Sequence, residues 1–202
     1  MEESAPGALP GLPTRLLKVF FAPGELFSAL RERPAWVGAT LVVSALVGLS
    51  LVVIPAELWV EFSRSQMMER GQEIPPGFES SGGTAMRIFS VVGGVLGTAI
   101  MIFVMAGVVT AFFSFVLGAE GGYKHYLSVV AHASIITAVG SLVMVPLKIS
   151  QGDPSLSLSL GSFAFFLEEG YLLRVLKMLD LFALWSYGVM AVGVTKIDPR
   201  QS

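Results

Sequence analysis

Three ionisable residues in the apolar part of the chain could do chemistry if they met. Lys177 and Asp180 are three residues apart, a spacing that places both side chains on one face of a helix. His132 lies about two turns into another apolar segment. A carboxylate at the centre of a bilayer costs about 2.5–3.5 kcal/mol, so one found there is a candidate functional group. Together the three side chains would form a polar site able to bind a proton or a headgroup.

A purely structural explanation of the same residues is also open. At a membrane interface Lys177 can extend towards water, and its charge and that of Asp180 neutralise each other. A buried histidine such as His132 more often hydrogen-bonds a neighbouring helix than binds a metal. His125 is seven residues away on the same face, but two histidines without a third ligand make a poor metal site. We therefore expect no metal and no cofactor.

Sequence motifs for catalysis are missing. There is no nucleophile elbow, zinc-protease motif, phosphate-binding loop or dinucleotide-binding glycine pattern. The chain has no cysteine, which excludes disulfides, thiolate zinc sites and cysteine nucleophiles. The expected spans contain one aspartate at most, whereas intramembrane proteases need a serine–histidine pair or two aspartates. We expect no enzyme, and a net charge of −2 makes nucleic acid a poor candidate partner.

The composition is that of a membrane protein. Of the 202 residues, 53% are hydrophobic and 14% are charged, whereas soluble domains carry about 25% charged residues. Mean hydropathy is +0.73, and the apolar residues form long blocks. The predicted fold class is all-α, a polytopic helical membrane protein of about four transmembrane helices plus interfacial amphipathic helices. The expected membrane domain covers 35–196, with spans at about 36–56, 88–117, 126–146 and 172–194.

The segments outside the spans have distinct predictions. Residues 1–13 are expected to be a disordered N-terminal tail. Residues 197–202 are expected to be a short C-terminal tail. Residues 14–34 predict one or two short amphipathic helices broken at Pro23, lying either in the membrane interface or packed on the bundle from the cytosol. The polar loop after the first span is expected to be helical in its front half and a flexible linker in its back half.

The segment 155–167 gives conflicting signals. Leu156, Leu158 and Leu160 alternate with serines, which is the period of a strand. A lone strand in lipid would leave its backbone groups unpaired. The segment is also too short to cross a membrane. We therefore expect an interfacial or re-entrant helix.

The second span, 88–117, is uncharged for about 30 residues and contains no polar turn, so it predicts one long helix of about 45 Å that must tilt, kink or protrude. Gly93 and Gly97 form a GxxxG pair, and Gly107 and Ala111 form a second pair of small residues. Such pairs let neighbouring helix backbones approach closely. They could pack helices within the chain, which is the favoured interpretation, or form a dimer face.

Three stretches resemble the Yip family (Ypt/Rab-interacting proteins), in its bacterial branch. They are residues 19–27 followed by Pro34-Ala35-Trp36, residues 123–134, and residues 179–185 followed by Gly193. The most specific is the Asp-x-Phe-x-x-Trp pattern of Asp180, Phe182 and Trp185. An acid, an aromatic ring and an indole at a helix entry suit an interfacial anchor rather than a reaction centre.

The resemblance, which covers roughly Leu16 to Val194, implies an all-helical membrane domain with no established enzymatic activity. Eukaryotic members are similar to adaptors that bind Rab-type GTPases, but their Asp-Leu-Tyr entry motif is absent here, so that role is not carried over. The family usually has five spans and this sequence predicts four. We therefore expect a chain that is naturally short or one completed by a partner helix.

The function hypotheses follow from these observations. The first is a non-enzymatic protein that organises or adapts other membrane proteins or lipids, its partners being the bilayer and another membrane protein or itself. The alternative is a small transporter or transport-complex subunit that uses the Lys177/Asp180/His132 cluster. Arg31 and Arg33 precede the first span and acidic residues follow it, so the positive-inside rule predicts a cytoplasmic N-terminus in a bacterial inner membrane.

Overall fold

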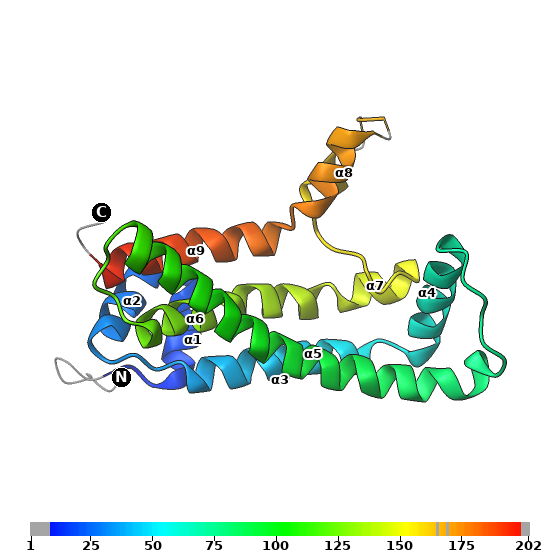
Figure 1. Cartoon of the computed structure of the whole chain (residues 1–202), viewed down its shortest axis with the longest axis horizontal. Helices are drawn as coiled ribbons and strands as arrows, with labels where there is room; N and C mark the ends of the chain where they lie inside the picture. Colours follow the sequence, from blue (N-terminus) through cyan, green and yellow to red (C-terminus); the bar gives the residue numbers. More distant parts are fainter. Residues whose placement is uncertain (1–8, 165, 169, 199–202) are drawn as a thin grey trace.

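The computed structural model describes residues 9–164, 166–168 and 170–198, and they form an all-α helical membrane protein. Helices α3, α5, α6 and α9 run along the long axis of the molecule, with α4 and α8 directed across it (Figure 1). The helices are α1 (Leu12–Phe21), α2 (Pro23–Glu32), α3 (Val37–Val53), α4 (Ala56–Glu69), α5 (Phe78–Ala111), α6 (Tyr123–Val143), α7 (Val145–Gln151), α8 (Tyr171–Met178) and α9 (Leu181–Ile197), with a π-helical turn at Phe112–Val116 and a 3-10 turn, η2, at Leu160–Phe163.

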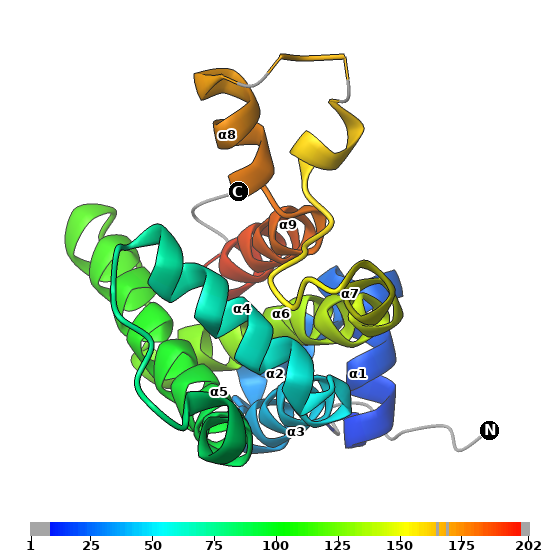
Figure 2. The ribbon, with the colours of Figure 1, turned by 90° about the vertical axis from the view of Figure 1, so that its right-hand side faces the viewer.

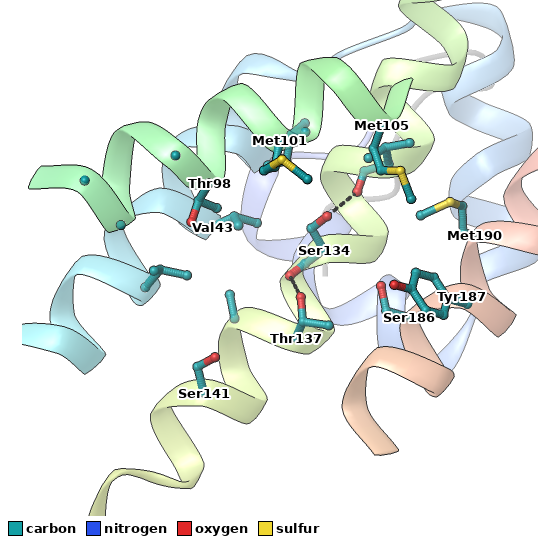
Figure 3. Close-up of a pocket in the computed structure, with 17 residues that line it drawn as sticks. Val43, Thr98, Met101, Met105, Ser134, Thr137, Ser141, Ser186, Tyr187 and Met190 are labelled. Carbon is teal, nitrogen blue, oxygen red and sulfur yellow. Dashed lines mark hydrogen bonds between the residues drawn. The ribbon is translucent and has the colours of Figure 1, made fainter. Parts of the chain in front are cut away.

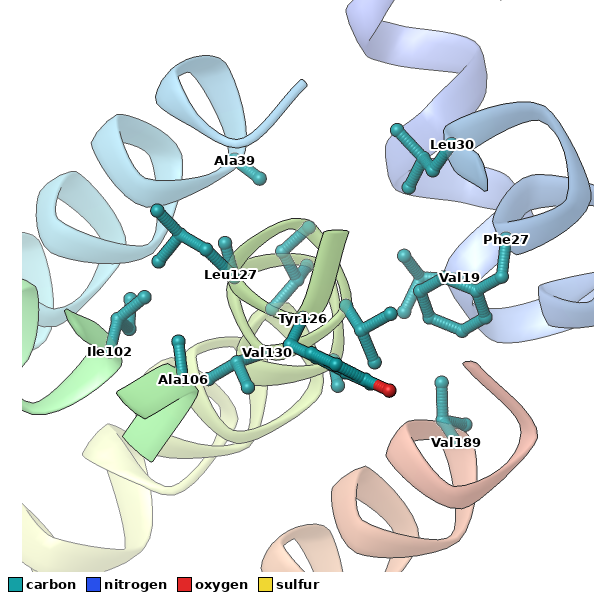
Figure 4. Packing of buried hydrophobic residues seen from close by; sticks show 14 of the residues in the cluster. Val19, Phe27, Leu30, Ala39, Ile102, Ala106, Tyr126, Leu127, Val130 and Val189 are labelled. Atoms are coloured by element: carbon teal, nitrogen blue, oxygen red, sulfur yellow. The ribbon is translucent and has the colours of Figure 1, made fainter. Parts of the chain in front are cut away.

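Helix α6 is the centre of the fold. It contacts α1, α2, α3, α5 and α9, and 67% of the residues in its most apolar 18-residue stretch are buried. Tyr126, Leu127 and Val130 of α6 lie among side chains from every helix around it (Figure 4). Ala131 and Ala133 are fully buried, and such small residues allow neighbouring helices to approach closely. The core of the protein is therefore the surface of α6 and what packs on it.

The N-terminal amphipathic segment folds as two helices. Pro23 begins α2, a position where its missing N–H is no loss and its fixed φ suits a helix. Val19 of α1 and Phe27 of α2 are fully buried, whereas Leu17 and Phe21 are exposed apolar side chains. The helices thus pack on the bundle and still present an apolar surface outwards. Helix α1 begins at Leu12, inside the tail predicted to be disordered, of which residues 1–8 lie outside the described part of the chain.

The first predicted span, 36–56, is the straight helix α3 followed by a sharp bend. Helices α3 and α4 meet at 86° around Ile54 and Pro55. The turn leaves carbonyl groups at the end of α3 without helical partners. Arg87 of α5 donates from Nη2 to the Val52 carbonyl oxygen at 2.6 Å. This contact joins the end of α3 to the side of α5.

The second predicted span is a single long helix, as its uninterrupted apolar run indicated. Helix α5 begins at Phe78, ahead of the expected 88, so it extends into the predicted flexible linker. It ends at Ala111, where a π-helical turn takes over. Only 11% of the residues in the most apolar 18-residue stretch of α5 are buried, so α5 lies at the periphery of the bundle, as Figure 2 also shows.

Fewer helices than expected are long enough to span a membrane. Among the described residues, Arg87–Val116 and Tyr123–Gln151 are long and apolar enough, and the bent pair α3 and α4 adds a third if counted as one span. Helix α9 is apolar but has only 17 residues, or about 26 Å of helix. The third predicted span, 126–146, corresponds to α6 with α7 following after a break at Met144.

The prediction of one continuous span over 172–194 is wrong. The chain leaves the helix at Leu179 and is extended at Asp180 (φ −70°, ψ 131°) before α9 begins. Arg174 and Lys177 make α8 amphipathic, and α8 projects away from the bundle in both views (Figures 1 and 2). A short acidic side chain favours the position before a helix over its interior, which explains the break at Asp180.

The prediction of a helix over 155–167 is also wrong. Pro154 and Ser155 lie in a turn, Ser159 forms an isolated antiparallel bridge with Asp180, and Leu160–Phe163 is the 3-10 turn η2. The Leu160 N–H donates to the Leu179 carbonyl oxygen at 2.9 Å, and the Leu181 N–H donates to the Leu158 carbonyl oxygen at 2.9 Å. The described residues of this segment therefore form neither the expected helix nor the strand that the alternation suggested. The backbone that enters α9 pairs with this irregular segment and satisfies its backbone groups.

Substitution of Gly193 tests the contact between α9, α6 and α2. A Cβ added there would lie 3.1 Å from the Phe27 ring and closer still to the Val129 side chain. Gly193→Val should lower the free energy of unfolding by about 1–3 kcal/mol, because it overpacks the core. Gly188→Val, on the same helix with nothing within 4 Å of its Cβ position, should unfold like the wild type. Thermal unfolding in detergent measures both, and equal midpoints would contradict this packing.

Candidate functional site

The residues of the predicted Lys177/Asp180/His132 cluster lie on three different elements. His132 is fully buried in the middle of α6, and its ring nitrogen Nδ1 donates to the Ser128 carbonyl oxygen at 2.8 Å within the same helix. Among the described residues, its Nε2 atom has no hydrogen-bond partner. Lys177 lies in α8 beside Gly161, where a Cβ would come within 2.8 Å of the Lys177 backbone nitrogen. The break before α9 leaves Lys177 in α8 and Asp180 at the start of α9.

Asp180 has a structural role at the start of α9. Its Oδ1 accepts a hydrogen bond from the Ala183 N–H at 2.9 Å, which makes Asp180 the N-cap of the helix. A carboxylate there satisfies a backbone N–H that has no helical partner and also interacts favourably with the helix dipole.

The Asp-x-Phe-x-x-Trp pattern attaches the beginning of α9 to the bundle. Phe182 lies directly over Gly140 of α6, where any added side chain would collide with its ring. Trp185 meets Phe20 of α1 edge-to-face, with ring centroids 5.5 Å apart. Asp180 starts the helix, Phe182 seats it on α6 and Trp185 joins it to α1. The three residues predicted to be an interfacial anchor thus make contacts within the fold.

The small residues of α5 lie mainly away from the other helices of the chain. A Cβ at Gly93, Gly97 or Gly107 would meet nothing within 4 Å, and Ala111 is exposed. The favoured interpretation, that these glycines pack helices within the chain, has no close contact behind it among the described residues, and Gly93 and Gly97 line a groove between α5 and α9. We call the surface formed by Gly93, Gly97, Gly107 and Ala111 the open face of α5.

Two other glycines bring α3 and α5 together. Gly48 of α3 lies against Val95, and Gly94 of α5 lies against Leu51. Sequence reasoning missed this pair because neither glycine belongs to the GxxxG pair of Gly93 and Gly97. The neighbouring Gly93 and Gly94 face different directions, so which of them packs depends on the rotation of α5 about its own axis.

A lateral groove of about 490 Å³ lies between α5 and α9. Met101 and Met105 of α5 and Met190 of α9 reach into it from opposite sides, above Ser134 and Thr137 of α6 (Figure 3). Ser134 Oγ donates to the Val130 carbonyl oxygen and Thr137 Oγ1 to that of Ser134, both at 2.8 Å. The groove is therefore apolar, because these hydroxyls are already bonded to their own helix.

An end pocket of about 210 Å³ adjoins the lateral groove. It is lined by the end of α6, by Lys148 of α7, by Leu156 and Ser157 of the irregular segment, and by Asp180. Lys148 and Asp180 are far apart in the sequence and meet because the chain returns over α6 before α9 begins. Sequence reasoning did not single out Lys148, and only its place just after a span, with Asp153 nearby, could have drawn attention to it.

Comparison with known proteins identifies the family. Residues 17–199 match the family model of the Yip1 domain. The chain belongs to the Yip1 family. It is also similar to the membrane protein YknW of Bacillus subtilis (strain 168), with 24% identity over 181 residues that cover 90% of this chain and 77% of YknW. No solved structure matches the chain. The family resemblance inferred from the entry segment, the hairpin and the Asp-x-Phe-x-x-Trp pattern is thereby confirmed.

The described residues of this Yip1 domain offer three features that could bind a partner. The described residues contain no group of three or more His, Asp or Glu that could hold a metal ion. The hydroxyls of Ser134, Thr137 and Ser186 are each bonded to a backbone carbonyl oxygen. The features that remain are a groove, an end pocket with two opposite charges, and an open helix face.

Replacement of Asp180 tests its capping role. Asp180→Ala removes the acceptor of the Ala183 N–H and should lower the free energy of unfolding by about 0.5–2 kcal/mol. Asp180→Asn keeps an acceptor oxygen at the N-cap and should unfold close to the wild type. Thermal unfolding of the two variants in detergent gives the comparison. If Asn were as damaging as Ala, the carboxylate charge rather than the cap would be the stabilising feature.

Proposed function

We propose that this protein is a non-enzymatic membrane protein that organises other membrane proteins by binding a transmembrane helix along the open face of α5. The observation that carries the proposal is that Gly93, Gly97 and Gly107 have open space where a side chain would be. In lipid, helices associate through small residues that allow close backbone approach and not through hydrophobicity, since lipid is equally apolar.

The spacing along α5 supports one continuous contact face. Residues 93, 97, 100, 104, 107 and 111 recur every three or four positions, which is the repeat of one helical stripe. Ile100 and Val104, between the two small pairs, are exposed. Ile102 and Ala106, on the other side of the helix, are buried against the bundle. The open face thus has no close packing partner among the described residues, and it adjoins the lateral groove at Gly93 and Gly97.

The partner is a second copy of this chain or another membrane protein. The transporter alternative depended on the Lys177/Asp180/His132 cluster, and it is less well supported because these residues lie in α8, at the start of α9 and in the buried middle of α6. A non-enzymatic role agrees with a family match and a relative that carry no enzyme name.

We also propose a bacterial inner membrane with the N-terminus in the cytoplasm. Arg31 and Arg33 precede α3, whereas Glu57 and Glu61 follow it, and positive charge is retained on the cytoplasmic side. Helices α1 and α2 and the last turn of α9 lie at the same end of the bundle (Figure 1). An even number of membrane crossings between α2 and the end of α9 agrees with that arrangement.

Bulky residues on the open face should prevent association. Because the chain has no cysteine, a single Val104→Cys marks the centre of the face for crosslinking in native membranes. Adding Gly97→Ile or Gly107→Ile should reduce the crosslinked product about tenfold, since either blocks backbone approach. Mass spectrometry of the product distinguishes a second copy from another protein.

Gly188→Ile is the matched control, because Gly188 lies on α9 with nothing within 4 Å of its Cβ position. It should leave the crosslinked product unchanged. A product that survives both α5 substitutions, or no product in any membrane preparation, would overturn the proposed function.

Cysteine labelling from outside the cell tests the orientation. Met68→Cys on α4 and Glu32→Cys on α2 place single thiols at exposed positions at opposite ends of the bundle. A membrane-impermeant maleimide should label Met68→Cys in intact cells and Glu32→Cys only after permeabilisation. The reverse pattern would place the N-terminus outside.

A further inference from the structure

The end pocket and the lateral groove adjoin along α6 and together make a hollow with two different environments. Thr137 and Ser141 line both. The groove is lined from the middle of α6, whereas the end pocket is lined from the end of α6, from α7 and from the start of α9. A polar compartment at an end and an apolar one at mid-depth match the two parts of a lipid.

The end pocket carries one charge of each sign. Lys148 is the cation and Asp180 is the anion, and both are partly buried. Within the described part of the chain neither has an ion-pair partner within 4.0 Å. Asp153 also acts electrostatically on Lys148, but its Oδ1 already accepts from the Ser155 backbone N–H at 2.8 Å and from its hydroxyl. Asp180 uses one carboxylate oxygen for the α9 cap, so the other remains for a ligand.

The groove is suited to a flexible apolar chain. The hydroxyls of Ser134, Thr137 and Ser186 already donate to backbone carbonyl oxygens, so an acyl chain beside them would break none of these hydrogen bonds. Met101, Met105 and Met190 line it, and methionine adapts to irregular apolar shapes. Its volume of about 490 Å³ lies in the range of small-molecule pockets.

We propose that this hollow binds one zwitterionic phospholipid with a primary ammonium headgroup, its phosphate at Lys148, its ammonium at Asp180 and one acyl chain in the lateral groove. The opposite charges of the pocket decide the headgroup class. An anionic headgroup would bring a second negative charge beside Asp180, and a protein helix would bring no partner for either charge. A choline headgroup has no N–H to donate to the carboxylate, so it binds more weakly than an ethanolamine headgroup.

Gly93 and Gly97 lie both on the open face and at the lateral groove, so this inference is tested at other residues than the association along α5. The purified full-length chain in detergent is titrated, under native mass spectrometry, with phosphatidylethanolamine, phosphatidylcholine and phosphatidylglycerol that carry identical acyl chains. One phosphatidylethanolamine should bind in preference to the other two. Lys148→Gln and Asp180→Asn should each weaken that binding about tenfold, as loss of a charge-assisted contact predicts. Asp180→Asn keeps the α9 cap acceptor, so a folding defect does not confound it.

Control variants separate the two compartments. Lys124→Gln, at the opposite end of α6, and Gly107→Ile, on the open face, should bind phosphatidylethanolamine like the wild type. Ser141→Phe fills the junction of the two compartments and should abolish binding, with thermal unfolding checking that the fold is kept. Glycerophosphoethanolamine, which has the headgroup without acyl chains, should not compete at equal concentration.

Three results would overturn the proposal. The first is equal binding of the three lipids, and the second is a preference for phosphatidylglycerol. The third is unchanged binding in both Lys148→Gln and Asp180→Asn. Full competition by glycerophosphoethanolamine would equally exclude the acyl-chain part of the site.

Discussion

The structure depends on the burial of one helix, α6, by neighbours on several sides. A helix in this position has little surface left for lipid, so most of its surface must fit another helix. Its small residues and the glycines opposite them meet that requirement: Phe182 enters at Gly140, and Val129 enters opposite Gly193. The shape of the bundle follows from these close approaches, because hydrophobicity alone does not bring helices together in lipid.

The second determinant is the satisfaction of backbone groups where helices stop. The chain does not cross from α7 to α9 as open loop. It pairs Leu158 and Leu160 with Leu181 and Leu179, and Asp180 then caps α9. At the end of α3, Arg87 donates a hydrogen bond to the Val52 carbonyl oxygen. The backbone pairing before α9 brings Lys148 and Asp180 into one pocket. The polar character of that pocket therefore results from how backbone groups at helix ends find hydrogen-bond partners.

Sequence reasoning predicted the parts of the fold that local composition controls. The membrane class, the long α5 and the break at Pro23 could be derived from residue types and spacing, whereas attention to the Asp-x-Phe-x-x-Trp pattern came from the family resemblance. The rotation of α5, which decides that Gly94 and not Gly93 packs, could not, because it depends on α3. The partner of the Leu-Ser alternation and the meeting of Lys148 with Asp180 depend on long-range chain return, for which no local pattern exists.

The polar groups of α6 have a consequence for biosynthesis. Ser128, Ser134 and His132 each bond to a carbonyl oxygen within α6 itself. Ser186, on α9, which follows α6 in the chain, instead bonds across to Ala133 of α6. The hydroxyls of Ser128 and Ser134 can therefore be satisfied as soon as α6 is helical. The core is completed only when α9 arrives with a hydroxyl that matches a carbonyl oxygen of α6.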